Sequence, residues 1–300
     1  MISVIIPTLN RPDTLAHALT SLSHQTYRDF ETIVVNDGGP SARHIVDHWR
    51  RELTMTLLEL PSRSGPARAR NIAIDHASGD FLAFLDDDDL FLPTHLETAH
   101  QTLTGVSTVD FVYLSALVSG DRLDSDTPLI EGSPHQKAYP FNEPFLHVAN
   151  YLHTGAVVTR TFRDTSVRFD EALTHCEDWD MWLALRLRLG LEMRHVNALT
   201  TVYHQIRNSG SAVQVAQQEN PTPFSIARER IHRKWPSSDS QVREYRAWMD
   251  NFELHRNMVN ASGLPVPVFL FDRVLAYLYP RFVKQESADA GAIPGLFSEP

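Results

Sequence analysis

Short apolar runs alternate with segments of helical spacing over the first 90 residues. The segment between the first two runs repeats apolar residues three and four apart and carries Pro12 in its first turn. A second such segment opens at Gly65-Pro66 and ends near Ser78-Gly79. This alternation is typical of a parallel sheet with crossover helices, and it predicts four strands, at residues 3–6, 32–35, 55–60 and 81–85.

The rest of the chain changes character near residue 215. Further strands are predicted at 110–118, 155–159 and 192–202, with a helix at 179–191 and a surface excursion at 120–144. From 221 onward two or three helices are expected. We therefore expect an α/β domain over residues 1–215, with a mostly parallel central sheet and flanking helices, and a helical extension over 216–300.

The extension contains an apolar stripe with 4-3-4-3-4 spacing, made by Leu264, Val268, Phe271, Leu275, Leu278 and Phe282. A helix packed on its own domain would produce such a stripe. The alternatives are a homodimer seam and a membrane-surface face, and the scarcity of Lys and Arg around the stripe disfavours the membrane.

Composition narrows the class of protein. The 300 residues carry a net charge of −10, which argues against a nucleic-acid partner. The single cysteine, Cys176, rules out an intramolecular disulfide and fits a reducing cytoplasm. The best candidate for a transmembrane span, residues 266–279, contains Asp272 and Arg273, so we expect no span and a cytoplasmic location.

The strongest chemical signal is an apolar strand, 81–85, that runs directly into four consecutive aspartates at 86–89. Open α/β sheets bind ligands at this end of their strands. Adjacent carboxylates repel one another, so holding several of them ionised calls for a cation or strong donors. Oxygen ligands suit a hard divalent ion such as Mg²⁺ or Mn²⁺, which keeps positions for water and substrate phosphates.

Glycine-rich phosphate loops are missing from the sequence. Pro7-Thr8-Leu9-Asn10 follows the first strand in place of GxGxxG, and GxxxxGK[ST] does not occur. A site that handles diphosphate through carboxylates and a metal ion indicates metal-assisted transfer from a nucleotide.

These segments, in order and spacing, resemble glycosyltransferase family 2: residues 4–11 (VIIPTLNR), 33–39 (IVVNDGG), 69–71 (ARN), 79–80 (GD) and 84–89 (FLDDDD). The resemblance covers about residues 1–210. It implies a glycosyltransferase-A fold, a nucleoside-diphosphate sugar donor, a divalent metal and inversion at the anomeric carbon.

The resemblance also assigns roles to single residues. It places Pro7 and Thr8 beside the nucleoside, Asp37 on the base and Arg70 near the base or the diphosphate. In the acidic run, Asp86 matches the position that meets the ribose, and Asp88 matches the metal ligand, with Asp87 and Asp89 beside them. The family more often has a small residue where Asp87 stands.

A second cluster, residues 175–182 (HCEDWDMW), resembles the Glu-Asp motif of the family, and Asp178 matches its catalytic base. A positioned carboxylate can take the proton of an acceptor hydroxyl as that hydroxyl attacks. Glu177 and Asp178 would also favour a helix N-terminus by capping and dipole effects. Trp179 and Trp182 lie three apart and fit a core better than an acceptor platform.

The segment 203–211 has the composition of a lid, in which Arg207 would contact the diphosphate and His204 the metal.

The function that the resemblance implies is transfer of a hexosyl or deoxyhexosyl group, from a UDP- or dTDP-sugar by preference, to an acceptor hydroxyl in cell-surface polysaccharide or specialised-metabolite glycosylation. The alternatives are a sugar-nucleotide nucleotidyltransferase and a non-catalytic sugar- or partner-binding module on the same fold.

Overall fold

The computed structural model describes residues 1–125, 136–206, 219 and 221–298. The chain forms two compact units. The first, here called the sheet unit, comprises Met1–Phe141 and Leu152–His204, and the second, the helical unit, comprises Asn142–Tyr151 and Gln205–Pro300. The predicted division at residue 215 falls within 207–218, outside the described residues.

The sheet unit is built on one sheet with strand order β3-β2-β1-β4-β8-β6-β9-β5 and β7 paired to β6. The strands are β1 (Ile2–Thr8), β2 (Phe30–Asn36), β3 (Met55–Glu59), β4 (Phe81–Phe84), β5 (Leu90–Phe91), β6 (Phe111–Ser119), β7 (Gln136–Lys137), β8 (Val157–Arg160) and β9 (Met193–His204). Every predicted strand is present within a few residues of its expected ends. The two-residue strands β5 and β7 were not predicted, because such short pairs carry no periodicity.

Most of these strands run in the same direction. β1 pairs in parallel with β2 and β4, β2 pairs in parallel with β3, and β6 pairs in parallel with β9. β8 is antiparallel to both β4 and β6, so β6 and β9 run with β1–β4. The expected mostly parallel sheet of an α/β fold is confirmed, and the carboxyl ends of β1, β2, β4 and β9 lie at the same edge.

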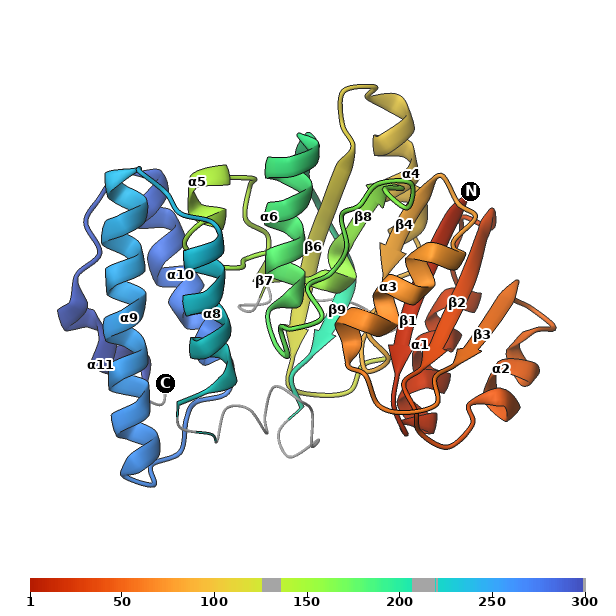
Figure 1. Cartoon of the computed structure of the whole chain (residues 1–300), viewed down its shortest axis with the longest axis horizontal. Coiled ribbons are helices and arrows are strands. Elements are labelled where there is room, and N and C mark those ends of the chain that lie inside the picture. Colours follow the sequence, from red (N-terminus) through yellow and green to blue (C-terminus); the bar gives the residue numbers. More distant parts are fainter. Residues whose placement is uncertain (126–135, 207–218, 220, 299–300) are drawn as a thin grey trace. The chain divides into compact units, whose positions relative to one another are not determined.

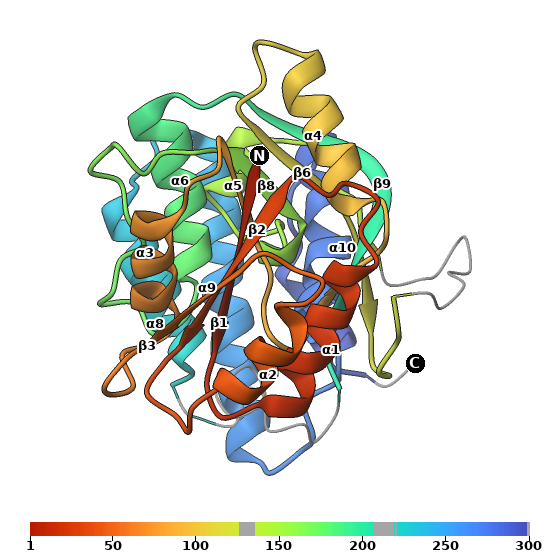
Figure 2. The same cartoon turned by 90° about the vertical axis from the view of Figure 1, so that its right-hand side faces the viewer.

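Helices cover both faces of the sheet (Figures 1 and 2). Helices α1 (Pro12–Ser23), α2 (Arg43–Trp49) and α4 (His95–Gly105) pack on the face that buries Ile2, Val4 and Ile6. Helix α3 (Pro66–His76) contacts β1 and β2, and α6 (Glu177–Leu189) contributes Trp182 to an aromatic core with Phe84, Phe111 and Phe169. Trp179 and Trp182 are both buried, as the core interpretation predicts.

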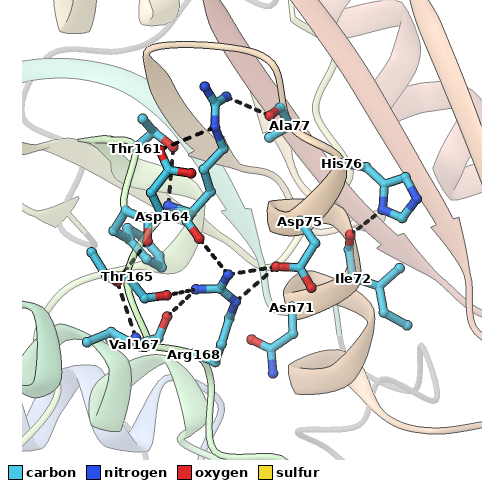
Figure 3. A network of polar contacts seen from close by, with 12 residues as sticks. Asn71, Ile72, Asp75, His76, Ala77, Thr161, Asp164, Thr165, Val167 and Arg168 are labelled. Atoms are coloured by element: carbon cyan, nitrogen blue, oxygen red, sulfur yellow. Dashed lines mark hydrogen bonds and ion pairs between the residues drawn. The ribbon is translucent and has the colours of Figure 1, made fainter.

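The connection from β8 to α6, residues 161–176, is fastened to α3 (Figure 3). Arg168 Nη2 lies 2.7 Å from Asp75 Oδ1, and Arg163 Nη1 donates to the Ala77 carbonyl at 2.7 Å. The Asn71 side chain donates to the Phe169 carbonyl at 3.0 Å and accepts from the Phe169 N–H at 2.8 Å. These bonds fix the segment that delivers the first turn of α6.

The helical unit contains α5 (Glu143–Leu146), α8 (Pro223–Lys234), α9 (Ser240–Ala261), α10 (Leu270–Val283) and α11 (Ile293–Leu296). The apolar stripe that was predicted to begin at Leu264 starts later, because Phe269 adopts a left-handed conformation and the helix begins at Leu270. Its buried residues pack inside the unit: Phe282 contacts Phe145 and Tyr245. Within the residues that the structure describes, no helix combines the length and apolar character that a bilayer crossing requires.

Candidate active site

The residues selected from the sequence gather at the carboxyl edge of the sheet. Thr8 and His204 end β1 and β9, Asp37 directly follows β2, and the acidic run 86–89 begins two residues after β4. These segments are distant in sequence but parallel in the sheet, so their ends are brought together. Pro7 is the second-last residue of β1 and pairs with Val35 of β2.

The four aspartates of the run alternate between partly exposed and buried side chains. Asp86 and Asp88 keep 31% and 30% of their side-chain surface exposed, whereas Asp87 and Asp89 keep 6% and 1%. Asp86 and Asp88 are therefore the carboxylates available to a ligand, and Asp87 and Asp89 are tied into the protein.

Asp87 is held by hydrogen bonds to both of its oxygens. Thr8 Oγ1 donates to Oδ2 at 2.6 Å, and Arg11 Nη1 donates to Oδ1 at 3.1 Å. The same Arg11 nitrogen donates to Asp88 Oδ2 at 3.0 Å. Burial raises the pKa of Asp87 to about 6, with a further contribution from Asp88, while Thr8 and Arg11 oppose that rise. Burial and the charge of Asp86 likewise raise the pKa of Asp88.

Asp89 lies between two histidines. Its Oδ1 accepts the His204 backbone N–H at 2.8 Å, and its Oδ2 lies 3.1 Å from His153 Nε2. Complete burial, followed by the charge of Asp88, raises the pKa of Asp89 well above its usual range. Asp89 thus joins the acidic run to the end of β9 and acts as a structural carboxyl.

Both ring nitrogens of His204 are engaged in this structure. Nε2 accepts the Leu123 N–H at 3.1 Å, which places the proton on Nδ1, 2.8 Å from the Asp88 carbonyl oxygen. Burial lowers the pKa of His204 to about 4, so the ring is neutral. As a metal ligand His204 would have to give up one of these two bonds. Arg207, the other predicted lid residue, lies outside the described residues.

Arg70 connects the two acidic clusters. Its Nη2 donates to Asp86 Oδ1 and its Nη1 donates to Glu177 Oε1, each at 2.6 Å. The side chain is only 4% exposed, and its guanidinium lies 5.5 Å from the centre of the Phe169 ring. Burial lowers the pKa of Arg70, but the two carboxylates outweigh burial and the net pKa is raised. Burial also raises the pKa of Glu177 in spite of Arg70.

Asp178 follows Glu177 at the N-terminus of α6. Thr154 Oγ1, which is buried in the short 3₁₀ turn before β8, donates to Asp178 Oδ2 at 2.8 Å. The Trp179 N–H donates to Oδ1 at 2.7 Å. The Asp178 side chain is partly exposed, so this carboxylate is oriented by two donors and still open to solvent.

Asp37 is oriented by the loop after β3. The Ser64 and Gly65 N–H groups donate to its Oδ1 and Oδ2 at 2.6 and 2.8 Å. The next residue, Gly38, has φ +80°, and a Cβ there would lie 2.3 Å from the Ser62 carbonyl carbon. The loop and the β2 end therefore approach so closely that only glycine fits.

The donor set fits a hard divalent cation. Asp86 and Asp88 supply carboxylate oxygens with partial exposure, and Mg²⁺ or Mn²⁺ is commonly held by one or two carboxylates together with substrate phosphates. Among the described residues no group of three or more His, Cys, Asp or Glu is arranged as a complete metal cage. The arrangement suits a cation that is shared with a bound diphosphate.

Sequence reasoning missed three contributors to this site: Arg11, Asn71 and Thr154. Asn71 belongs to the ARN segment, which could have singled it out, but its bond to Phe169 spans 98 residues and has no local signal. Arg11 ends the VIIPTLNR segment, but that segment gives no sign of the carboxylates that Arg11 contacts, and Thr154 has no signal in the sequence.

Comparisons with known proteins show the family of this chain. Residues 3–162 match the family model described as glycosyl transferase family 2. An uncharacterized glycosyltransferase of Bacillus subtilis, YwdF, is 30% identical over 209 residues, which cover 67% of this chain and 73% of that protein. The amylovoran biosynthesis glycosyltransferase AmsB of Erwinia amylovora is 26% identical over 70% of this chain and 71% of its own length.

Solved structures share the fold at low sequence identity. S. aureus TarS 1-349 in complex with UDP-GlcNAc superposes with a TM-score of 0.57 at 17% identity, covering 98% of this chain and 90% of that one. The mannosyltransferase PcManGT from Pyrobaculum calidifontis, in complex with GDP-Man and Mn²⁺, gives a TM-score of 0.58 at 18% identity, covering 98% and 84%.

The family match spans more than half of the chain and the relatives that it resembles are named as glycosyltransferases, so the expected fold and enzyme class are confirmed. The chain belongs to glycosyl transferase family 2 and is a glycosyltransferase with a glycosyltransferase-A fold.

Proposed function

We propose that this enzyme transfers a sugar, with inversion, from a nucleoside-diphosphate sugar to an acceptor hydroxyl and uses Mn²⁺ or Mg²⁺. The observation that carries the proposal is the Arg70 bridge, because it holds the acidic run and the Glu177-Asp178 pair at one edge of the sheet. A donor bound at Asp86 and Asp88 would then present its anomeric carbon near Asp178.

Asp178 is the proposed general base. As the acceptor oxygen forms its bond to the anomeric carbon, the bond from that carbon to the diphosphate breaks, and the acceptor proton moves to Asp178. Thr154 and the Trp179 N–H hold the carboxylate in one orientation during this transfer. A cation held by Asp88 and Asp86 would supply charge stabilisation for the departing diphosphate.

The nucleotide is proposed to contact Asp37, Pro7 and Thr8. With one lone pair of each oxygen committed to the loop, Asp37 retains acceptor capacity for the imide N–H of uracil or thymine, which favours a UDP- or dTDP-sugar. The fold relatives bind UDP-GlcNAc in one case and GDP-Man in another, so both base classes belong in the test.

The proposed acceptor class is a hydroxyl of a polysaccharide precursor. Two relatives are named for polysaccharide synthesis, AmsB for amylovoran and the Rhizobium meliloti protein ExoW for succinoglycan. A cytoplasmic site of action, a homodimer through residues 264–282 and a diphosphate contact from Arg207 stay predictions of the sequence.

Calorimetric titration with UDP, GDP, dTDP and CDP, each with Mn²⁺ and with EDTA, tests donor class and metal use together. We expect one nucleotide to bind in Mn²⁺ and to lose that affinity in EDTA, and Asp88→Asn to lose only the metal-dependent part. Equal affinity in Mn²⁺ and EDTA for every nucleotide that binds would contradict metal dependence.

The base assignment has a separate test. Asp178→Asn should lower kcat about 100-fold or more while the nucleotide Kd stays within about threefold, since general base catalysis contributes 10²–10⁴-fold. Asp164→Asn, a 90% exposed aspartate in the 161–176 connection, serves as the matched control and should behave as wild type. Turnover of Asp178→Asn near that of the control would remove Asp178 from the mechanism.

A further inference from the structure

Arg11 places one cationic nitrogen between two carboxylates of the acidic run. Nη1 lies 3.1 Å from Asp87 Oδ1 and 3.0 Å from Asp88 Oδ2. The residue stands at the N-terminal boundary of α1, where Asn10 has a left-handed φ of 52° and Pro12 starts the helix. The left-handed Asn10 and the fixed φ of Pro12 direct Arg11 toward the acidic run and not into helix α1.

The charges at this edge are divided between two arginines. Arg70 holds Asp86 and is itself held by Glu177, so its charge is fully committed. Arg11 serves Asp87 and Asp88, and its side chain is 34% exposed while Asp88 is 30% exposed. Arg11 can therefore move into solvent, whereas Arg70 is enclosed.

The Asp88 oxygen that Arg11 contacts belongs to the carboxylate on which the proposed divalent cation depends. A cation at Asp88 and a guanidinium 3.0 Å from the same oxygen repel each other across a few ångströms. The cation alone must displace Arg11, but a bound diphosphate adds negative charge that can accommodate both positive groups. Asp87, whose Oδ1 lies 3.1 Å from the same Arg11 nitrogen, would keep Arg11 beside the site after it leaves Asp88.

We propose that Arg11 is an internal counter-cation that competes with the divalent metal for Asp88 and so makes metal binding depend on bound nucleotide. The inference rests on the proposed function and goes beyond it, because it assigns a positioning residue and a coupling between two ligands. By linkage, the same coupling makes nucleotide binding depend on the metal to an equal degree.

The test is a titration of the full chain with Mn²⁺ alone, without nucleotide. Electron paramagnetic resonance measures the free Mn²⁺ at each step. We expect Arg11→Gln to bind Mn²⁺ at least about fivefold more tightly than wild type, since the competing charge is gone. The improvement that UDP or GDP brings to Mn²⁺ affinity should shrink by the same factor. A merely structural role for Arg11 would weaken or leave unchanged the affinity for Mn²⁺.

Two further variants keep the test sharp. Arg11→Lys retains a positive charge and can reach the same oxygens with its ammonium, so it should restore weak Mn²⁺ binding and strong nucleotide dependence. Arg43→Gln removes a positive charge from an arginine that is 64% exposed and paired with Glu59, and it should match wild type. If Arg11→Gln does not fold, Arg11→Met is measured in its place against the same lysine variant.

The failure of this inference can be told from the failure of the proposed function. Unchanged or weaker Mn²⁺ binding by Arg11→Gln, in a protein whose wild type binds Mn²⁺ together with UDP or GDP, overturns the role of Arg11 alone. The absence of Mn²⁺ binding in wild type and Arg11→Gln, with and without either nucleotide, overturns both.

Discussion

Replacing Arg70 by methionine should destabilise the sheet unit strongly. The substitution keeps much of the apolar stem but removes a buried cation that donates to Asp86 and to Glu177 at 2.6 Å. Glu177 is only 10% exposed and would lose its cationic partner, while Asp86, at 31%, can turn to water. Breaking a buried ion pair from one side costs about 3–5 kcal/mol. We expect the lower end of that range, because burial already favours protonation of Glu177 and because Asp86 can be hydrated.

The measurement is urea unfolding monitored by tryptophan fluorescence, to which Trp179 and Trp182 of α6 contribute together with Trp49, Trp235 and Trp248. The control is Arg68→Met on the same helix, where Arg68 and Glu171 are 53% and 43% exposed and the expected loss is under about 1 kcal/mol. The double variant Arg70→Met/Glu177→Gln removes both charges. We expect it to lose at least about 1 kcal/mol less than the sum of the single losses, as contacting charged pairs do.

Two results would refute this reasoning. A loss below about 1 kcal/mol for Arg70→Met would mean that the guanidinium contributes no more than a surface charge. Strict additivity of Arg70→Met and Glu177→Gln would mean that the two clusters are not energetically joined through Arg70. In that case the observation that carries the proposed function would lose its force.

Three further changes have defined outcomes. Gly38→Ala should lower stability by about 1–3 kcal/mol in thermal denaturation, because alanine disfavours φ +80° and its Cβ would meet the Ser62 backbone; Gly105→Ala, with open space around it, should be neutral. Burial lowers the pKa of His95 to about 3, so only the unfolded chain gains this proton below pH 6.5; His95 alone should contribute about 2 kcal/mol to the fall in stability between pH 7 and pH 5, and His95→Gln should reduce that fall by the same amount while His44→Gln should not. Thr154→Val should reduce kcat/KM about tenfold with the nucleotide Kd unchanged, and Thr154→Ser should restore it; an unaltered rate in the valine variant would contradict the orienting role.

The sheet was predictable from the sequence because its strands are apolar runs bounded by polar turns. The run 81–85 is the best example: it is buried throughout and leads straight to Asp86, so the place of the acidic run at the sheet edge follows from strand direction alone. Helix α10 shows the limit of such patterns. Its stripe correctly indicated an apolar face, but the spacing could not reveal that Phe269 would turn left-handed and delay the start of the helix.

The partners within the site were not predictable in the same way. Arg70 and Glu177 are 107 residues apart in the sequence. Thr154 precedes β8 and Asp178 follows it, yet the two side chains are hydrogen-bonded. Such pairs depend on the order of the strands in the sheet, which the spacing of apolar residues along the sequence does not determine. His204 illustrates the converse: its type suggested a ligand, while its surroundings commit both nitrogens to backbone groups.

The alternating exposure of the acidic run explains how one strand end can serve both stability and chemistry. The run is a turn after β4, in which the Asp89 N–H donates to the Asp86 carbonyl oxygen at 3.1 Å. Asp87 and Asp89 point into the protein, where Thr8, Arg11, His153 and the His204 backbone surround them and fix the path of the chain. Asp86 and Asp88 keep 31% and 30% of their side-chain surface exposed on the same turn, which suits a cation shared with a diphosphate. The contacts of Asp87 and Asp89 thus hold the turn that leaves Asp86 and Asp88 available to a ligand.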